Sequence, residues 1–190
     1  MQDDSKRILE KLQTQFETFV PNARKEHDFF AVASIEEATI AAKEGNLGIG
    51  AVIVDANGQI VSRGHNRTFY PYFRSDLHAE MDAMTSFEER FKHVTNMQDY
   101  TLFSSLEPCP MCTTRLITSG IGKVFYFAGD ADAGMANNLK RLGPVWGELA
   151  EKQVFSKADC SQEATDLAYQ FFLATIDGYL KKLMDRRGKR

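Results

Sequence analysis

The spacing of apolar residues predicts two helices at the start of the chain. Over residues 5–20 the apolar positions recur every three or four residues, at Ile8, Leu9, Leu12, Phe16 and Phe19, which is the period of an amphipathic helix. Pro21-Asn22 ends this segment. A second helix, rich in apolar residues, is expected over residues 26–43, and Gly45-Asn46 closes it.

The period then changes to that of strands. Residues 49–54 form a buried strand, Asp55-Ala56-Asn57-Gly58 a tight turn, and residues 59–64 the returning strand of a hairpin. Further strands are expected over residues 100–105, 123–128 and 153–156, and helices over residues 77–91, 109–118 and 162–184. Strands that alternate with helices predict an α/β fold with three layers, α/β/α, in which helices cover both faces of the sheet.

No repeat, low-complexity tract or Gly/Ser linker divides the chain, so a single domain over residues 1–190 is predicted. Within it, residues 1–20 form a helical N-terminal extension, and residues 162–190 form a C-terminal helix with a basic tail. The composition, with 43% hydrophobic and 26% charged residues, is that of an ordinary soluble globular protein.

Several classes of protein are not expected from the sequence. No segment approaches about 18 uninterrupted apolar residues, so we expect no membrane partner. The N-terminus lacks the basic-then-apolar order of a signal peptide, and a cytoplasmic location is therefore expected. Three cysteines are too few for a disulfide scaffold.

Charge is unevenly distributed along the chain. The net charge is −3, but residues 181–190 hold six basic residues and one acidic residue, so the remainder carries −8. A basic tail suits contacts with phosphates, and it equally suits a solvated helix end whose cations complement the helix dipole. The acidic remainder argues against a broad positive surface for nucleic acid.

Two short motifs have the spacing of a catalytic metal site: His78-Ala79-Glu80 and Cys109-Pro110-Met111-Cys112. Two cysteines separated by two residues at a helix start direct both sulfurs toward one metal, and His78 from another helix supplies a third ligand. Three ligands leave the fourth tetrahedral position for water, as in catalytic zinc sites. We therefore predict one Zn²⁺ per chain, with Glu80 as the group that transfers the proton of that water.

Each motif taken alone is compatible with a different chemistry. Cys-x-x-Cys also occurs in redox pairs and in halves of structural zinc sites. A second Cys-x-x-Cys is absent from the sequence, and this pair follows the third predicted strand, whereas a redox pair usually follows the first. A non-catalytic zinc module stays the alternative from another class, although such a module has no use for Glu80. The joint pattern is typical of zinc nucleobase deaminases.

Four segments in this order resemble the cytidine deaminase superfamily, in the branch of yeast-type cytosine deaminase, bacterial guanine deaminase and tRNA adenosine deaminase. They are residues 48–54, 64–67, 78–80 and 106–112, and the resemblance covers about residues 26–135. It implies a cytidine-deaminase-like fold with a five-stranded mixed sheet, two zinc-binding helices side by side, and usually a homodimer. It also implies a hydrolytic deaminase with His78, Cys109 and Cys112 as ligands and Glu80 as proton shuttle.

The resemblance further implies contacts with the substrate. Asn66 matches the family asparagine that hydrogen-bonds the ring or its carbonyl, Ala79 a residue whose backbone N–H meets the substrate, and Ala51 a wall of the pocket. We add Glu107, within the cysteine motif, and Asp130 and Asp132, which follow the strand predicted over residues 123–128. The two aspartates are candidates to recognise an exocyclic amine or a ring N–H.

The resemblance does not decide the substrate. Arg74-Ser75-Asp76-Leu77 stands where many guanine and tRNA deaminases carry Asp-Pro-Thr-Ala, whereas residues 107–112 and 125–128 are similar to guanine deaminase. Because the chain is acidic outside its tail, we expect a free nucleobase or nucleoside, of cytosine or guanine type, as substrate and small-molecule partner. Deamination of adenosine to inosine in tRNA is the alternative.

Residues 69–74, which we call the aromatic loop, contain four aromatic residues and Arg74. Such a segment suits a homodimer contact, where aromatic residues are enriched, and it also suits stacking of single-stranded bases. We favour the dimer contact and predict a homodimer. His27 and His65 are interpreted as packing or surface residues and not as metal ligands.

Overall fold

The computed structural model describes residues 2–188, with side chains from residue 6 onward, and its centre is a five-stranded sheet. The strands lie in the order β2-β1-β3-β4-β5; β1 is antiparallel to β2 and β3, whereas β3, β4 and β5 are parallel. The strands are β1 (Gly50–Val54), β2 (Ile60–His65), β3 (Thr101–Leu106), β4 (Lys123–Ala128) and β5 (Val154–Lys157). The predicted five-stranded mixed sheet is confirmed.

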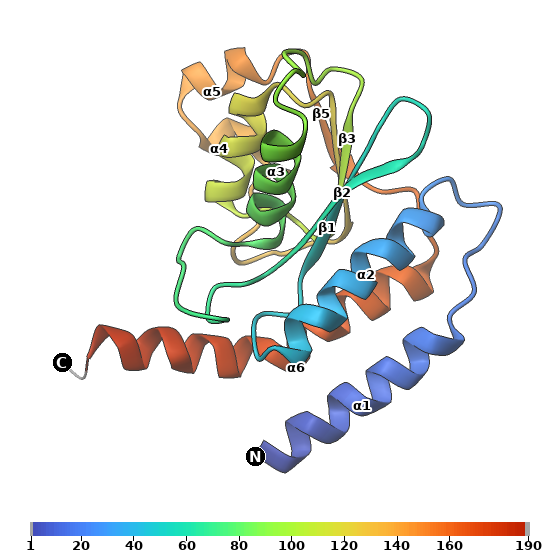
Figure 1. Cartoon of the computed structure of the whole chain (residues 1–190), viewed down its shortest axis with the longest axis vertical. Helices are drawn as coiled ribbons and strands as arrows, with labels where there is room; N and C mark the ends of the chain where they lie inside the picture. The colour runs from blue at the N-terminus through green and yellow to red at the C-terminus, as the bar shows by residue number, and fades with distance from the viewer. Residues whose placement is uncertain (1, 189–190) are drawn as a thin grey trace.

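Helices cover both faces of this sheet (Figure 1), which confirms the three layers. One face carries α2 and α6, with α1 packed outside them, and the other face carries α3 and α4. The helices are α1 (Gln2–Thr18), α2 (Asp28–Lys43), α3 (Ala79–Arg90), α4 (Pro110–Ser119) and α6 (Gln162–Arg187). None of the described helices is long and apolar enough to cross a membrane. Part of the predicted basic tail, Lys189 and Arg190, lies outside the described residues.

Alternation along the strands divides the core into two clusters, one on each face of the sheet. In β1, Val52 and Val54 join Phe103 of β3 beneath α2 and α6. The intervening residue Ile53 joins Leu102 of β3 beneath α3 and α4. Successive side chains of a strand point to opposite faces, so the near-continuous apolar runs of the sequence result from burial on both sides.

Two glycines let helices approach the sheet closely. A Cβ atom on Gly50 would overlap the backbone of Ser34 on α2, and one on Gly64 would overlap the backbone nitrogen of Ala83 on α3. No other residue fits these contacts without displacing a helix. Gly64 therefore determines how closely α3 packs on β2, and with it the position of Glu80 in the first turn of α3.

The structure contains two short helices that the apolar pattern does not predict: the 3₁₀ helix η1 (Leu139–Arg141) and α5 (Pro144–Leu149). Neither contains a buried residue. Because neither helix buries a stripe of side chains, the sequence carries no helical apolar period there. The other predicted elements occur with ends displaced by a few residues.

Candidate metal centre and catalytic cavity

The predicted metal ligands lie together although 28 residues separate the two motifs. The ligand atoms of His78, Cys109 and Cys112 are all within 4.8 Å of one another, and this is the only such group of His, Cys, Asp or Glu in the part of the chain that the structure describes. His78 Nδ1 is 3.6 Å from Cys109 Sγ. One imidazole nitrogen and two thiolates are the donors that zinc prefers, so the donor set fits this ion.

Two helix N-termini form the cluster. His78 is the N-cap of α3 and Cys109 the N-cap of α4, and both have extended backbone, with ψ of 165° and 171°. Pro110 occupies the first helical position of α4, where its fixed φ suits a helix start. Cys112 follows in the same turn, so both sulfurs lie where the helix dipole stabilises negative charge.

The hydrogen bond between the two cysteines favours the thiolate form of Cys109. The bond from the Cys112 thiol lowers the pKa of Cys109 to about 4, against the opposing effect of burial. The same bond, together with burial, raises the pKa of Cys112 well above its ordinary value. Metal binding releases the remaining proton, so zinc affinity depends on pH.

Glu80 is buried beside this cluster without belonging to it. The residue is 4% exposed, and Ser104 Oγ on β3 donates a hydrogen bond of 3.3 Å to its Oε1. Burial, and then the neighbouring Cys109 sulfur, raises the pKa of Glu80, while His78 opposes the shift. A carboxyl group whose pKa lies nearer to neutrality suits proton transfer in both directions.

A cavity of about 490 Å³ opens onto the cluster at the carboxyl ends of β3 and β4. His78, Glu80 and Cys109 line its inner part. Helix α6 supplies one wall of the cavity, and none of its residues is among the predicted site residues: Tyr169, Phe172, Leu173, Ile176, Tyr179 and Leu180. Their spacing indicates one helix face, but nothing in the sequence indicates what that face covers.

The three acidic candidates line the same cavity and have different surroundings. Both carboxylate oxygens of Glu107 accept backbone N–H bonds, from Asp130 at 3.2 Å and from Asn137 at 2.8 Å. Asp130 accepts N–H bonds from Asp132 and Ala133. Glu107 therefore holds the segment after β4 against the cavity. The side chain of Asp132, in contrast, accepts none of these backbone N–H bonds.

The other predicted substrate contacts lie deeper. Ala51 and Ala79 are fully buried in the core cluster under α3, and Asn66 is fully buried just after the end of β2. None of these three residues belongs to the wall of the cavity within the described part of the chain. Ala79 is nonetheless the first residue of α3, next to His78.

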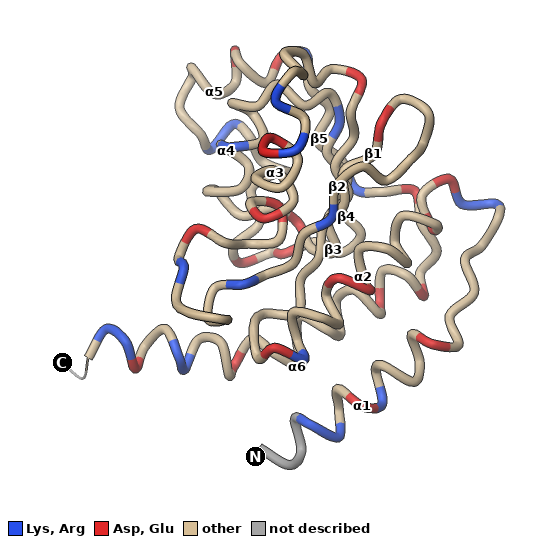
Figure 2. Tube along the Cα trace, in the orientation of Figure 1, with Lys and Arg blue, Asp and Glu red and all other residues tan. Residues whose placement is uncertain are grey.

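The aromatic loop packs against the C-terminal end of α6. The guanidinium of Arg186 lies 3.6 Å from the ring centre of Phe73, and Lys182 Nζ lies 5.3 Å from that of Phe69. Tyr70 and Tyr72 are exposed, with exposed fractions of 52% and 63%. The loop and this helix end thus form one surface, and Figure 2 shows Lys and Arg in both segments.

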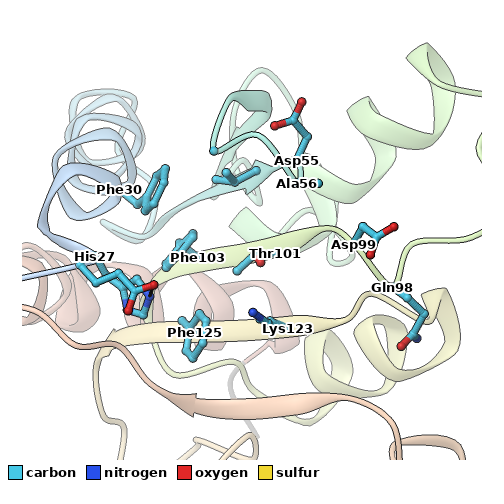
Figure 3. A pocket seen from close by; sticks show the side chains of 13 residues that line it. His27, Phe30, Asp55, Ala56, Gln98, Asp99, Thr101, Phe103, Lys123 and Phe125 are labelled. Carbon is cyan, nitrogen blue, oxygen red and sulfur yellow. Dashed lines mark ion pairs between the residues drawn. The ribbon is translucent and has the colours of Figure 1, made fainter.

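A second cavity, of about 520 Å³, lies at the amino ends of β3 and β4, away from the metal ligands (Figure 3). His27 lines it and packs against the rings of Phe103 and Phe125. Its Nδ1 accepts the backbone N–H of Asp159 at 2.9 Å, and burial lowers its pKa. His27 is therefore a packing residue.

The metal-ligand cluster, the buried glutamate and the mixed sheet define a zinc-dependent deaminase, a hydrolase that acts on carbon–nitrogen bonds. Residues 24–128 match the cytidine and deoxycytidylate deaminase zinc-binding region, a span that contains both motifs. The chain belongs to this family, which confirms the predicted superfamily and the predicted zinc cofactor.

Relatives of the chain include enzymes of tRNA. The tRNA-specific adenosine deaminase of Bacillus subtilis (strain 168) is 35% identical over 117 residues, which are 60% of this chain and 70% of that protein. The solved structure of a tRNA:A34 deaminase, studied for A-to-I editing at the wobble position, has a TM-score of 0.60 at 23% identity and covers 75% of this chain and 98% of its own. Guanine deaminase from Nitrosomonas europaea has a TM-score of 0.57 at 18% identity, covering 84% and 91%. At these identities the two structures show the fold alone.

These comparisons overturn the predicted substrate and partner. The prediction of a free nucleobase or nucleoside is wrong, because the curated relative at 35% identity is a tRNA-specific adenosine deaminase. That prediction rested on the −8 charge of residues outside the tail. Average charge was misleading because folding brings Lys182 and Arg186 onto the aromatic loop and creates a local basic surface.

Proposed function

We propose that this chain deaminates adenosine to inosine in the anticodon loop of a tRNA. The observation that carries the proposal is the surface formed by the aromatic loop and the basic end of α6 (residues 181–187), which adjoins the cavity with the metal ligands. The two parts meet at Tyr179, which lines the cavity and whose ring lies 5.4 Å from that of Phe69. The similarity to tRNA-specific adenosine deaminases supports the same substrate.

The residues of the cavity account for the chemistry of deamination. His78, Cys109 and Cys112 would hold zinc, which supplies hydroxide near neutral pH by lowering the pKa of water. Glu80 takes one proton of the attacking water and delivers it to a ring nitrogen. It then takes the second proton, from the hydroxyl group now on C6, and delivers it to the leaving amine. The water oxygen forms a bond to C6 of adenine, the bond from C6 to the amino group breaks, and ammonia leaves.

The surface beside the cavity has the two properties that a single-stranded RNA loop requires. Exposed Tyr70 and Tyr72 offer faces on which bases stack, a contribution of about 1–3 kcal/mol per base. The basic end of α6 offers cations to the phosphates, which dominate affinity for nucleic acids and make it dependent on salt. A base that leaves the stack of its loop reaches the cavity from this side.

The test is inosine formation by the purified zinc-loaded protein. We expect inosine at an anticodon position of tRNA or of an anticodon stem-loop, and no comparable ammonia release from cytosine, guanine or free adenosine. Removing two cations with Lys181→Ala and Arg187→Ala should weaken RNA binding and flatten its dependence on salt. The matched control is Lys152→Ala with Lys157→Ala, which removes two cations around β5 and should leave RNA binding unchanged.

Two results would contradict the proposal. One is deamination of free bases with no inosine in any tRNA. The other is equal loss of RNA affinity in the α6 pair and the β5 pair, because such a result would indicate a general effect of charge and not a defined surface.

A further inference from the structure

The side-chain amide of Asn66 has a hydrogen-bond partner for its oxygen but none for its nitrogen among the described residues. Its Oδ1 accepts the backbone N–H of Thr68 at 3.2 Å. Because that partner is a donor, the oxygen must face Thr68, and the orientation of the amide is settled. Asn66 Nδ2 is one of two buried side-chain polar atoms without a hydrogen-bond partner among the described residues. A buried N–H group without a partner is costly, so its presence calls for a function.

Thr68 is the residue through which the surrounding elements hold Asn66. Besides donating to Asn66, it accepts the backbone N–H of Arg74 at 2.8 Å through its carbonyl oxygen. Its hydroxyl accepts a hydrogen bond of 3.3 Å from the hydroxyl of Tyr179 on α6. Thr68 is 1% exposed and Tyr179 is 8% exposed, so water does not compete freely for these bonds.

Tyr179 comes from a part of the chain that the family match does not reach. The match ends at residue 128, whereas α6 begins at Gln162. Tyr179 lines the cavity that holds the metal ligands, and its ring contacts Phe69 of the aromatic loop. A second bond fixes α6 to the segment before β1, where Thr175 Oγ1 accepts the backbone N–H of Gly48 at 2.8 Å.

We infer that Tyr179 is a positioning residue for deamination: Tyr179 lines the cavity, its hydroxyl holds Thr68, and Thr68 holds the amide of Asn66 behind the cavity wall with an N–H group available to an acceptor on the substrate. The acceptor is a ring nitrogen or a carbonyl oxygen of the target base. The identity of that base rests on the proposed function, but the hydrogen-bonded chain from Tyr179 to Asn66 does not. Helix α6 thus takes part in the site as well as covering it.

The first experiment compares Tyr179→Phe with Tyr100→Phe. Tyr179→Phe keeps the ring contact and loses only the hydroxyl, whereas Tyr100 packs on Phe87 under α3. We expect Tyr179→Phe to lower kcat/KM about three- to tenfold, the effect of one net hydrogen bond, with unchanged zinc content and a melting temperature within about 4 °C of the wild type. Tyr100→Phe should match the wild type in all three measurements.

A double-mutant cycle separates positioning from general stability. In an Asn66→Ala background, Tyr179→Phe should cause no further loss of kcat/KM, because the group that Tyr179 positions is absent. Thr68→Val should reproduce the loss, and Thr68→Ser, which keeps the hydroxyl, should restore activity. Losses that multiply in the double variant, or a Thr68→Ser variant as impaired as Thr68→Val, would overturn the inference.

A measurement without substrate distinguishes failure of this inference from failure of the proposed function. The side-chain amide of Asn66 is identified in a ¹⁵N NMR spectrum by its loss in Asn66→Ala. We expect this resonance to shift in Tyr179→Phe and to stay in place in Tyr100→Phe. An unmoved resonance in Tyr179→Phe overturns the inference even if the wild type forms inosine. A shift combined with an inactive wild type contradicts only the proposed substrate.

Discussion

Glu80 lies beside the group of candidate metal ligands but is not part of it. Glu80 is buried, accepts a hydrogen bond from Ser104 and lies beside the sulfurs, and its pKa is raised by burial. Glu80→Gln keeps an oxygen that accepts the bond from Ser104. We therefore expect this variant to retain zinc and stability while turnover falls by about 10²–10⁴, the loss typical of a general acid–base group.

The measurements are zinc content by elemental analysis and the rate of inosine formation. Glu88→Gln is the control, since Glu88 lies on the same helix but pairs with Arg115 at its surface, and it should be fully active. Cys109→Ser is expected to lose zinc. Loss of zinc in Glu80→Gln, or near-normal turnover, would show that Glu80 has another role.

His65 is bonded to acidic residues on both sides of its ring. Nδ1 lies 3.0 Å from Glu37 on α2, and Nε2 lies 3.3 Å from Glu44 at the end of that helix. Burial lowers the pKa of His65, but these carboxylates and Asp82 outweigh burial and raise it overall. A raised pKa in the folded state means that the charged ring stabilises the fold below its unfolded pKa, and that this contribution disappears as pH rises through the folded pKa.

We therefore expect His65→Gln to destabilise the protein more at pH 6 than at pH 9. The difference in the free energy of unfolding should be on the order of 1 kcal/mol at pH 6, because partial exposure to solvent screens the pair. Denaturant unfolding at both pH values measures it. His93→Gln, at an exposed histidine, should follow the wild-type profile. A His65→Gln effect equal at both pH values would exclude the ionic contribution.

At the scale of secondary structure, the contact between α3 and β2 positions Glu80, the proposed proton carrier. Gly64 has no room for a Cβ atom because the backbone of α3 lies against it. Gly64→Ala should displace α3 and lower the free energy of unfolding by about 1–3 kcal/mol, the usual cost of overpacking. Because His78 and Glu80 move with α3, zinc affinity and turnover should fall as well.

Gly178→Ala is the matched control within α6. A Cβ atom at Gly178 meets nothing within 4 Å, and alanine favours a helix interior by up to about 1 kcal/mol. Thermal unfolding should show Gly178→Ala at or above the wild-type melting temperature and Gly64→Ala below it. Equal melting temperatures for the two variants would mean that α3 tolerates displacement.

At the scale of the whole molecule, we propose that two copies of the chain associate, as the family resemblance implies. Light scattering at micromolar concentration should give about twice the monomer mass of 21.4 kDa. Two of the four rings in the aromatic loop are already packed within the chain, Phe69 on Tyr179 and Phe73 under Arg186. We therefore expect Tyr72→Ser to remain dimeric and to lose RNA affinity. A monomeric Tyr72→Ser variant would instead place the dimer contact in the aromatic loop.

The class of fold and the donor set of the metal centre could be predicted from the sequence. Apolar periodicity predicted the five strands and the long helices because each buries a face and so carries a regular pattern. His78, Cys109 and Cys112 were predictable because a metal restricts both the type and the spacing of its ligands. The helices η1 and α5 were missed because they bury no residue and therefore carry no pattern.

The surroundings of the metal centre, in contrast, could not be predicted and depend on how the helices pack. The apolar face of α6 was visible as a pattern, but only folding places it along the cavity with Tyr179 beside Thr68. The charge of the chain predicted a small substrate. That prediction was wrong, because net charge does not record where the cations lie in the fold. Lys182 and Arg186 are far from the aromatic loop in the sequence and contact it in the fold. Contacts at such separation depend on the packing of whole helices, which local patterns do not specify.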